Sequence, residues 1–109
     1  MTAMADGDTI VSGGVSFDAV WLRCRVTLSR RDDERIVSID DVPDAVTAPT
    51  FYVDPLLVDV SGELKPGASG TGRVKVLLLE DRGDELVVEV PGEPVSYGAK
   101  LVIPRSVLA

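Results

Sequence analysis

The chain has 109 residues, of which 45% are hydrophobic and 27% charged, and its formal net charge is −7. This composition predicts one globular domain and excludes a disordered chain, and the acidic surface disfavours non-specific binding to nucleic-acid phosphates. The absence of histidine and the presence of a single cysteine exclude histidine-dependent hydrolase triads, imidazole zinc sites and any internal disulfide.

The two ends of the chain predict a simple organisation. We expect residues 1–8, which are small and acidic, to form a flexible N-terminus, and residues 9–109 to form a single β domain. The start of the chain lacks the basic region and apolar run of a signal peptide, and no apolar run approaches the ~20 residues that span a bilayer. The sequence therefore predicts a cytoplasmic protein without membrane partners or cofactors, with a virion as the alternative location.

A short strand at 9–11 is followed by a long strand at 15–30 whose apolar pattern changes phase. Apolar residues occupy odd positions as far as Ala19 and even positions from Val20 onward. Because a slip of one residue turns the buried face of a strand outward, we expect a bulge or a sharp bend at residues 18–20.

Two side chains in the second half of this strand bear on function. Cys24 shares the inward face with Leu22, so we interpret it as a small buried hydrophobic residue. Trp21 then points outward. It is either an anchor for an interface or a cover for the end of a barrel, and the sequence leaves both open.

The middle of the chain alternates short strands with loops. We expect a charged turn at 29–35, a strand at 35–39 and a loop at 40–49 with one helical turn at 44–46. Extended structure follows at 50–60, broken at Pro55, because proline cannot donate to a strand ladder. Residues 61–72 are rich in Gly, Pro and Ser and are predicted to form a loop.

The most strongly patterned stretch is a predicted hairpin at 71–90. Its turn, Asp81-Arg82-Gly83, suits a three-residue loop in which Gly83 takes a positive φ beside a bulge. That register would pair Glu80 with Asp84 and Leu78 with Leu86. The two inward rows would then be Val74, Val76 and Leu78 on one strand and Leu86, Val88 and Val90 on the other.

Leu77 and Leu79 supply a second apolar face to the first strand of this hairpin. A strand that is apolar on both faces is either central in a sheet or in contact with a partner. After the hairpin we expect a turn at 91–94, strands at 95–97 and 100–103, and a closing turn at 104–108. Strands spaced every ~8–12 residues predict an all-β fold, a small β-barrel or β-sandwich of about 6–8 short antiparallel strands.

Three short motifs lie in the last part of the chain: Lys65-Pro66-Gly67, Gly72-Arg73-Val74 and Pro104-Arg105-Ser106-Val107-Leu108. Over about the last 45 residues these motifs resemble the RNA-binding OB-type repeat of a large ribosomal small-subunit protein. The resemblance implies a similar barrel topology. Such repeats stack bases on aromatic side chains beside a basic groove, and the corresponding strands here offer only Tyr97.

Three classes of function remain open on these residues. An enzyme would depend on carboxylates, such as the pairs Asp40/Asp41 and Glu80/Asp84, and neither pair has a recognisable catalytic context, so we expect no enzymatic activity. A nucleic-acid-binding small barrel is the alternative, with arginines as the contacts: Arg23, Arg25, Arg30, Arg31 and Arg35.

The class that we favour is a non-catalytic protein-interaction or assembly module. It would be a homo-oligomer, a subunit of a larger complex or a virion structural protein, and its partner would be another protein or a second copy. Several strands carry more apolar residues than one face of a small domain needs, which favours contact with a partner. The interface candidates are Trp21, Leu77 and Leu79.

Overall fold

Almost every regular element of the protein is an antiparallel strand, which confirms the predicted all-β fold class. The computed structural model describes residues 9–12, 15–42, 48–95 and 98–109, and these contain no α-helix. The elements are β1 Thr9–Ser12, β2 Val15–Leu28, β3 Arg35–Ser38, β4 Thr50–Val53, the 3₁₀ turn η2 Pro55–Leu57, β5 Val58–Val60, β6 Ser69–Asp81, β7 Glu85–Glu89, β8 Glu93–Pro94, β9 Lys100–Pro104 and the 3₁₀ turn η3 Arg105–Val107.

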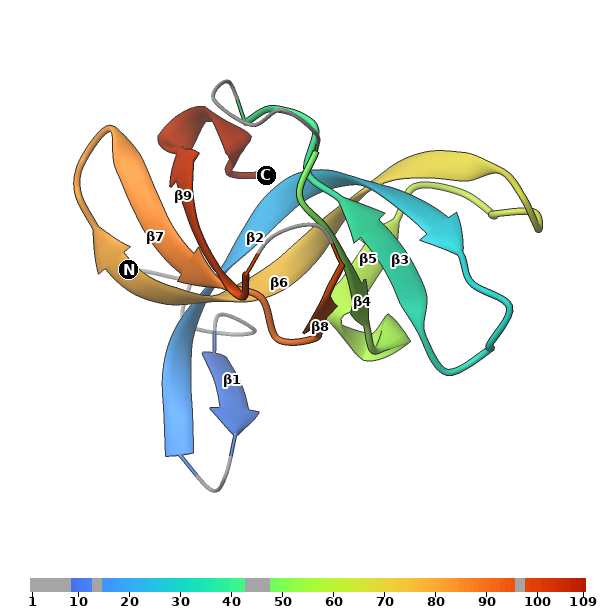
Figure 1. Ribbon diagram of the computed structural model, residues 1–109, viewed down its shortest axis with the longest axis horizontal. Coiled ribbons are helices and arrows are strands. Elements are labelled where there is room, and N and C mark those ends of the chain that lie inside the picture. The colour runs from blue at the N-terminus through green and yellow to red at the C-terminus, as the bar shows by residue number, and fades with distance from the viewer. Residues whose placement is uncertain (1–8, 13–14, 43–47, 96–97) are drawn as a thin grey trace.

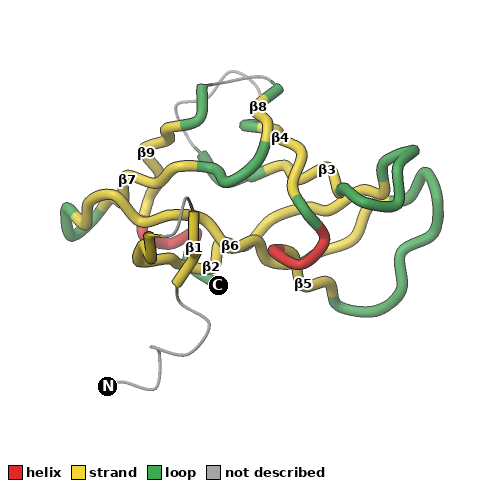
Figure 2. The backbone as a smooth tube through the Cα atoms, turned by 90° about the horizontal axis from the view of Figure 1, so that it is seen from below, coloured by secondary structure: helices red, strands yellow, loops and turns green. Residues whose placement is uncertain are grey.

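Two long strands organise the sheet. β2 has 14 residues and β6 has 13, and they pair from Ala19 opposite Leu77 to Thr27 opposite Ser69. Both cross most of the molecule (Figure 1). β2 corresponds to the long strand predicted at 15–30, whereas β6 begins earlier than the hairpin strand predicted from residue 71. The remaining strands extend the sheet in the order β8-β4-β3-β2-β6-β7-β9, with β1 beside β2 and β5 beside β6. Viewed from below, the sheet curls into a half-barrel around its core (Figure 2).

The core is built from the inward face of each strand. Most of the predicted inward residues of β2, β6 and β7 are confirmed, because alternate residues such as Leu22, Val74 and Val88 are almost fully buried. Leu78, which was also predicted to face inward, is only partly buried against the core. Pro55 breaks the segment between β4 and β5, as expected, and starts η2. The side chains with no more than 1% of their surface exposed are Leu22, Val26, Val37, Ile39, Phe51, Val74, Val76, Leu86, Val88, Ile103 and Val107.

Contacts between residues that are distant in sequence hold both ends of the curled sheet in place. The chain leaves β7 and enters β8, where Glu93 lies opposite Tyr52 of β4. After η3, Leu108 forms a bridge with Leu22 of β2, and the Ala109 N–H donates to the Trp21 carbonyl at 3.0 Å. The predicted closing turn, which buries Val107, is therefore confirmed.

The turn of the β6–β7 hairpin differs from the predicted one. The Arg82 N–H donates to the Glu85 carbonyl at 2.9 Å, so the loop has two residues, Gly83 and Asp84, rather than three ending at Gly83. Gly83 has the predicted positive φ, 89°. Glycine at the first of two loop positions is the type II′ pattern, whose twist matches that of the flanking strands.

The shorter loop shifts the register of the hairpin. A bulge lies between Leu78 and Glu80, so that Leu78 is opposite Val88 and Glu80 is opposite Val87. The bulge is thus in the middle of the hairpin and not beside Gly83. The predicted pairs, Glu80 with Asp84 and Leu78 with Leu86, do not form.

The glycine-rich loop predicted at 61–72 is also shorter, because β6 already begins at Ser69. Gly72 lies within β6 where β5 passes very close to it. A Cβ atom at this position would lie 2.5 Å from the Asp59 carbonyl oxygen and 3.2 Å from a methyl group of Val26. The sequence placed Gly72 in a loop, but it lies in a strand, where the neighbouring strand is too close to leave room for a side chain.

Four other expectations from the sequence have different outcomes. The pairings of β2 contain no register shift, so the bulge, one of the two alternatives predicted at 18–20, is wrong; the partner of β2 changes there from β1 to β6. Of the strand predicted at 95–97, Val95 is not in a strand and residues 96–97 lie outside the described residues, while β8 lies just before it at Glu93–Pro94. The helical turn at 44–46 and the N-terminal residues 1–8 also lie outside them. Within the described part of the chain, no helix has the length and apolar character to cross a membrane.

Candidate functional site

Trp21 lies on the outer face of the sheet between cationic side chains of β6. Its side chain is half-buried and its pairing partner is Lys75. The Arg73 guanidinium lies 4.3 Å from the centroid of the indole ring, and the Lys75 ammonium lies 5.8 Å from it. Both distances are within the range of a cation–π attraction. Arg73 also donates to Asp59 at 3.1 Å, which holds its guanidinium in place.

The two leucines predicted as interface candidates have very different exposure. Leu77 is opposite Ala19, and only 8% of its surface is exposed. Its own chain covers it, so it offers little surface to a partner. Leu79 is the extra residue of the β6 bulge and is 43% exposed. The structure therefore separates Leu79 from Trp21 by the buried row that contains Leu77.

Leu79 belongs instead to an apolar surface that sequence reasoning missed. Val87 of β7 is beside the bulge, and Val102 of β9 lies directly opposite Val87. Val102 is 47% exposed and Val87 is half-buried. These three residues, Leu79, Val87 and Val102, form what we call the β9 surface.

The signal for the β9 surface was present in the sequence. The runs 77–79, 86–88 and 101–103 each consist of three consecutive apolar residues. Successive side chains of a strand point to opposite faces, so at least one apolar residue of each run must face outward. On β7 and β9, as on β6, a second apolar face favours contact with a partner, because Leu86, Val88 and Ile103 already fill the core.

The β9 surface borders an edge of the sheet. Two hydrogen bonds flank the β7–β9 ladder: Val90 donates to the Ala99 carbonyl at 2.8 Å and Arg105 donates to the Asp84 carbonyl at 2.9 Å. Since hydrogen-bonded pairs alternate in antiparallel ladders, Leu101 bonds to β7 and Val102 does not. The N–H and C=O of Val102 thus point away from β7, and among the described residues no strand pairs with that side of β9.

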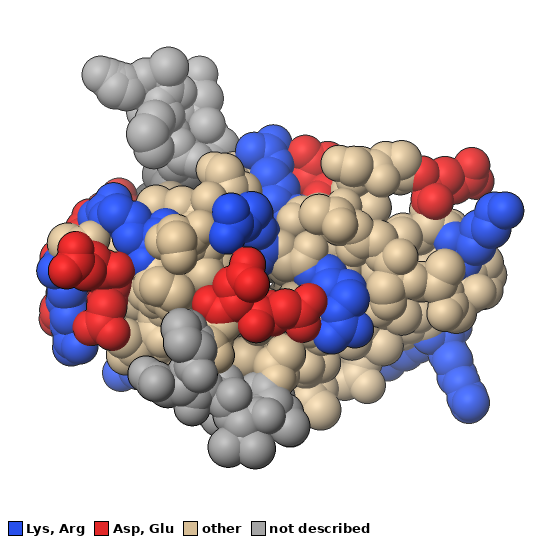
Figure 3. Space-filling model, turned by 90° about the horizontal axis from the view of Figure 1, so that it is seen from above, with Lys and Arg blue, Asp and Glu red and all other residues tan. Residues whose placement is uncertain are grey.

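Two of the predicted nucleic-acid contacts, Arg23 and Arg25, lie on the outer face of β2 and bind carboxylates. Arg25 donates to both oxygens of Asp40, from Nε at 3.1 Å and from Nη2 at 3.0 Å. Arg23 donates to Asp41 at 3.3 Å. Acidic and basic side chains are interspersed on the face seen from above (Figure 3). Neutralisation by the aspartates leaves little unpaired positive charge here for phosphate.

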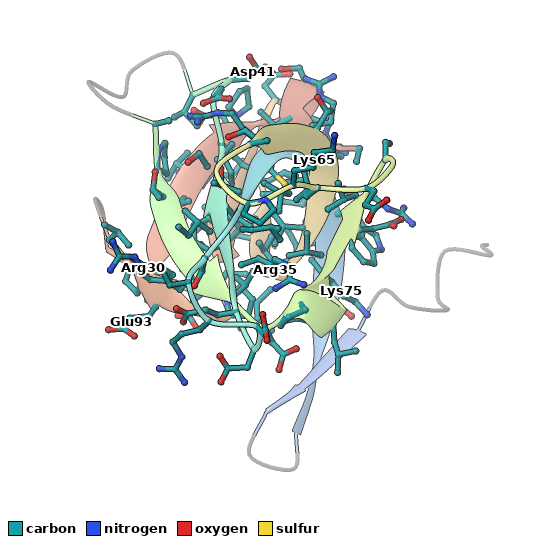
Figure 4. All side chains as sticks on the ribbon, turned by 90° about the vertical axis from the view of Figure 1, so that its right-hand side faces the viewer. Arg30, Arg35, Asp41, Lys65, Lys75 and Glu93 are labelled. Carbon is teal, nitrogen blue, oxygen red and sulfur yellow. The ribbon has the colours of Figure 1, made fainter. Side chains whose placement is uncertain are left out.

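The other three predicted contacts lie elsewhere. Arg31 binds Asp33 within its own turn, at 2.9 and 3.1 Å, and Arg35 donates to main-chain carbonyls of the same turn. Arg30 is exposed. Figure 4 shows Arg30, Arg35 and Lys75 on different parts of the surface rather than around one point. The five arginines do not form one basic surface.

A hollow of about 330 Å³ lies beside the Arg25–Asp40 pair and includes Cys24 and Thr71 in its lining. Burial, together with the charge of Asp40, raises the pKa of the Cys24 thiol to about 12, so the thiol stays protonated near neutral pH. The hollow therefore contains no thiolate nucleophile. Among the described residues, no group of three or more Cys, Asp or Glu side chains is placed to hold a metal ion.

The Arg25–Asp40 pair gives the protein a small pH dependence. Its hydrogen bonds lower the pKa of Asp40 below the ordinary value of 3.8, so the folded state gains stability above that pH and loses it as the pH falls further. Because both side chains are about half exposed, we expect a contribution below about 1 kcal/mol. Urea denaturation at a series of pH values measures this contribution. With Asp40→Asn, the free energy of unfolding should fall less steeply as the pH is lowered through the acid range. The same substitution should have no effect in an Arg25→Gln background, and an equal effect there would contradict the pairing.

No protein-family model, no curated protein and no solved structure matches this chain. The resemblance to the OB-type repeat therefore remains an expectation about barrel topology.

Proposed function

We propose that this domain is a non-catalytic protein-interaction module that assembles through the β9 edge and the β9 surface. The observation that carries the proposal is the juxtaposition of two features of β9. Val102 exposes an apolar side chain on the outer face, and its backbone N–H and C=O point to the edge of β9 with which no described strand pairs. An edge strand with apolar side chains beside it is a template for pairing with another strand.

The flanks of β9 restrict such pairing to a short, defined segment. Lys100 opens the strand and Pro104 closes it, and charge and proline are the usual means of limiting pairing at an edge. Only Val102 lies between them on the unpaired side. The arrangement favours a specific contact over uncontrolled aggregation.

Substitution of the β9 surface tests the proposal. We expect Val102→Lys to abolish association, because a charge would be buried at the contact, and Leu79→Lys, which is two strands from the edge, to weaken association less. Both side chains are exposed in the isolated chain, so folding should be retained. The measurement is mass in solution by light scattering, with and without lysate as a source of partners.

Leu56→Lys is the matched control for these substitutions. Leu56 is 89% exposed, but it lies on η2, between β4 and β5. It should leave association unchanged. Equal loss of association in all three variants, or in none, would contradict the proposal.

A second candidate function is nucleic-acid binding at Trp21. The indole ring with Arg73 and Lys75 beside it combines an aromatic face and positive charge, as single-strand-binding sites do. The net charge of −7 weighs against it. Titration with a single-stranded oligonucleotide, followed by the fluorescence of Trp21, distinguishes the two functions. Binding that weakens steeply with added salt would favour this candidate.

A further inference from the structure

The edge of β9 is complementary to itself. We propose that its occupant is a second copy of this chain, paired antiparallel about a two-fold axis that places Val102 opposite Val102 of the second copy. This inference rests on the proposed function and specifies the partner. The two Val102 residues would exchange two backbone hydrogen bonds, because the N–H and C=O of each point to the unpaired edge.

The same register accommodates the proline. Lys100 would lie opposite Pro104 of the second copy, and its N–H would donate to the proline carbonyl. Proline has no N–H to return the bond, so pairing stops there on both sides. The joined segment is therefore five residues long, which is the length of β9.

The outer face of the joined sheets would carry three matched rows. The central row continues the β9 surface across the axis, where the two Val102 residues are adjacent and Val87 and Leu79 of each copy lie successively farther away. In each flanking row, Lys100 is beside Glu89 of its own β7 on one side, and on the other side Glu85 of the second copy lies just beyond Pro104 of that copy. The apolar row is thus bordered by complementary charge.

The antiparallel arrangement also suits the negative charge of the chain. The tip of the β6–β7 hairpin carries four carboxylates, Glu80, Asp81, Asp84 and Glu85, near one end of β9. Arg82 and Arg105 pair with Glu80 and Asp81, so a net negative charge remains. Two-fold pairing places the two acidic tips at opposite ends of the joined sheet, whereas parallel pairing would place them side by side. Like charges brought together in that way would oppose parallel association.

Disulfide trapping tests the register. Residues opposite one another in a hydrogen-bonded antiparallel pair have Cα atoms ~5.5 Å apart, which is within reach of a disulfide. Under mild oxidation Val102→Cys should give a covalent dimer. Leu79→Cys has nearly the same exposure, but the two copies of residue 79 would be separated by about five strand spacings, roughly 24 Å, and should not cross-link. The native Cys24 is buried and should not compete.

A charge exchange provides an independent test. Within one chain Lys100 and Glu85 are four residue steps apart along the strands, roughly 13 Å, whereas across the proposed axis they are two strand spacings apart, roughly 10 Å. Lys100→Glu should weaken dimerisation about 10-fold, as should Glu85→Lys, and the double variant should restore it to within about threefold. Sedimentation velocity gives the dissociation constants.

The outcomes separate this inference from the proposed function. Cross-linking by Val102→Cys alone, with rescue by the charge exchange, supports the two-fold pairing. If Val102→Lys abolishes association while Val102→Cys does not cross-link and the double variant is not rescued, the two-fold pairing is wrong and the proposed function stands. If Val102→Lys has no effect on association, both are wrong.

Discussion

Gly92→Ala is expected to destabilise the fold by about 3 kcal/mol or more, because an added methyl group meets backbone more closely here than at any other glycine that the structure describes. A Cβ atom at Gly92 would lie 1.7 Å from the carbonyl oxygen of Tyr52 and 3.1 Å from the Cα atom of Val53. Those are backbone atoms of β4, so no side chain can move aside to relieve the contact. The connection from β7 to β8 would have to separate from β4, and with it the tie that closes the curled sheet.

Gly98→Ala is the matched control for this prediction. A Cβ atom at Gly98 meets no atom within 4 Å, and its φ is not in the left-handed region. We expect its stability to remain within about 0.5 kcal/mol of the wild type or to rise slightly, because alanine restricts the unfolded chain. Urea denaturation monitored by far-ultraviolet circular dichroism measures both variants. Equal stability of the two variants would contradict the close approach of β4 at Gly92.

Leu22→Ala is expected to cost about 2–5 kcal/mol, a large part of the stability of a domain of this size. Leu22 has no exposed surface and lies in the long strand β2. It pairs with Val74 of β6 on one side and forms the bridge with Leu108 on the other. Its loss would leave a cavity where the C-terminal segment is attached to the sheet.

Leu56→Ala removes the same atoms from a site that is 89% exposed and should change stability by less than about 0.5 kcal/mol. The difference between the two leucine variants, measured by urea denaturation, isolates the contribution of burial from that of the residue type. A cost below about 1 kcal/mol for Leu22→Ala would show that β2 is not packed as described.

Local patterns in the sequence were sufficient for the inward faces and for most element positions. Alternation identified Val74, Val76, Leu86 and Val88 as core residues, and each is fully or almost fully buried. Pro55 marked the break before β5. These features depend on neighbours within a few residues, which is the range over which strand periodicity and turn chemistry act.

The failures arose where a contact distant in sequence decides the conformation. Gly72 resembles a loop residue until β5 is seen to approach it, and Gly92 resembles an ordinary turn residue until Tyr52 is seen against it. The hairpin loop has two residues rather than three and lies at 83–84 rather than 81–83, and together these changes moved the partner of Glu80 from Asp84 to Val87. No local pattern distinguishes these cases.

The candidate site was predicted only in part. Leu79 was identified from its own strand, but its neighbours Val87 and Val102 come from two other strands and meet it only through the pairing of β6, β7 and β9. Leu77 had the same apolar pattern as Leu79, but its own chain buries it. The pattern shows that the second face of the strand is apolar and does not show what covers that face. Trp21 points outward as predicted, but the cationic neighbours of its ring, Arg73 and Lys75, come from β6 and could not be identified from its own strand.

Amide hydrogen exchange at β9, measured by NMR at several protein concentrations, tests directly whether the edge of β9 pairs with a second copy of the chain. We expect the Leu101 and Ile103 amides to be protected from exchange at every concentration, because they donate hydrogen bonds to β7. The Val102 amide should exchange rapidly in dilute protein and become protected as the concentration rises and the edges pair. Protection of Val102 that does not change with concentration would contradict the pairing of this edge with a second copy.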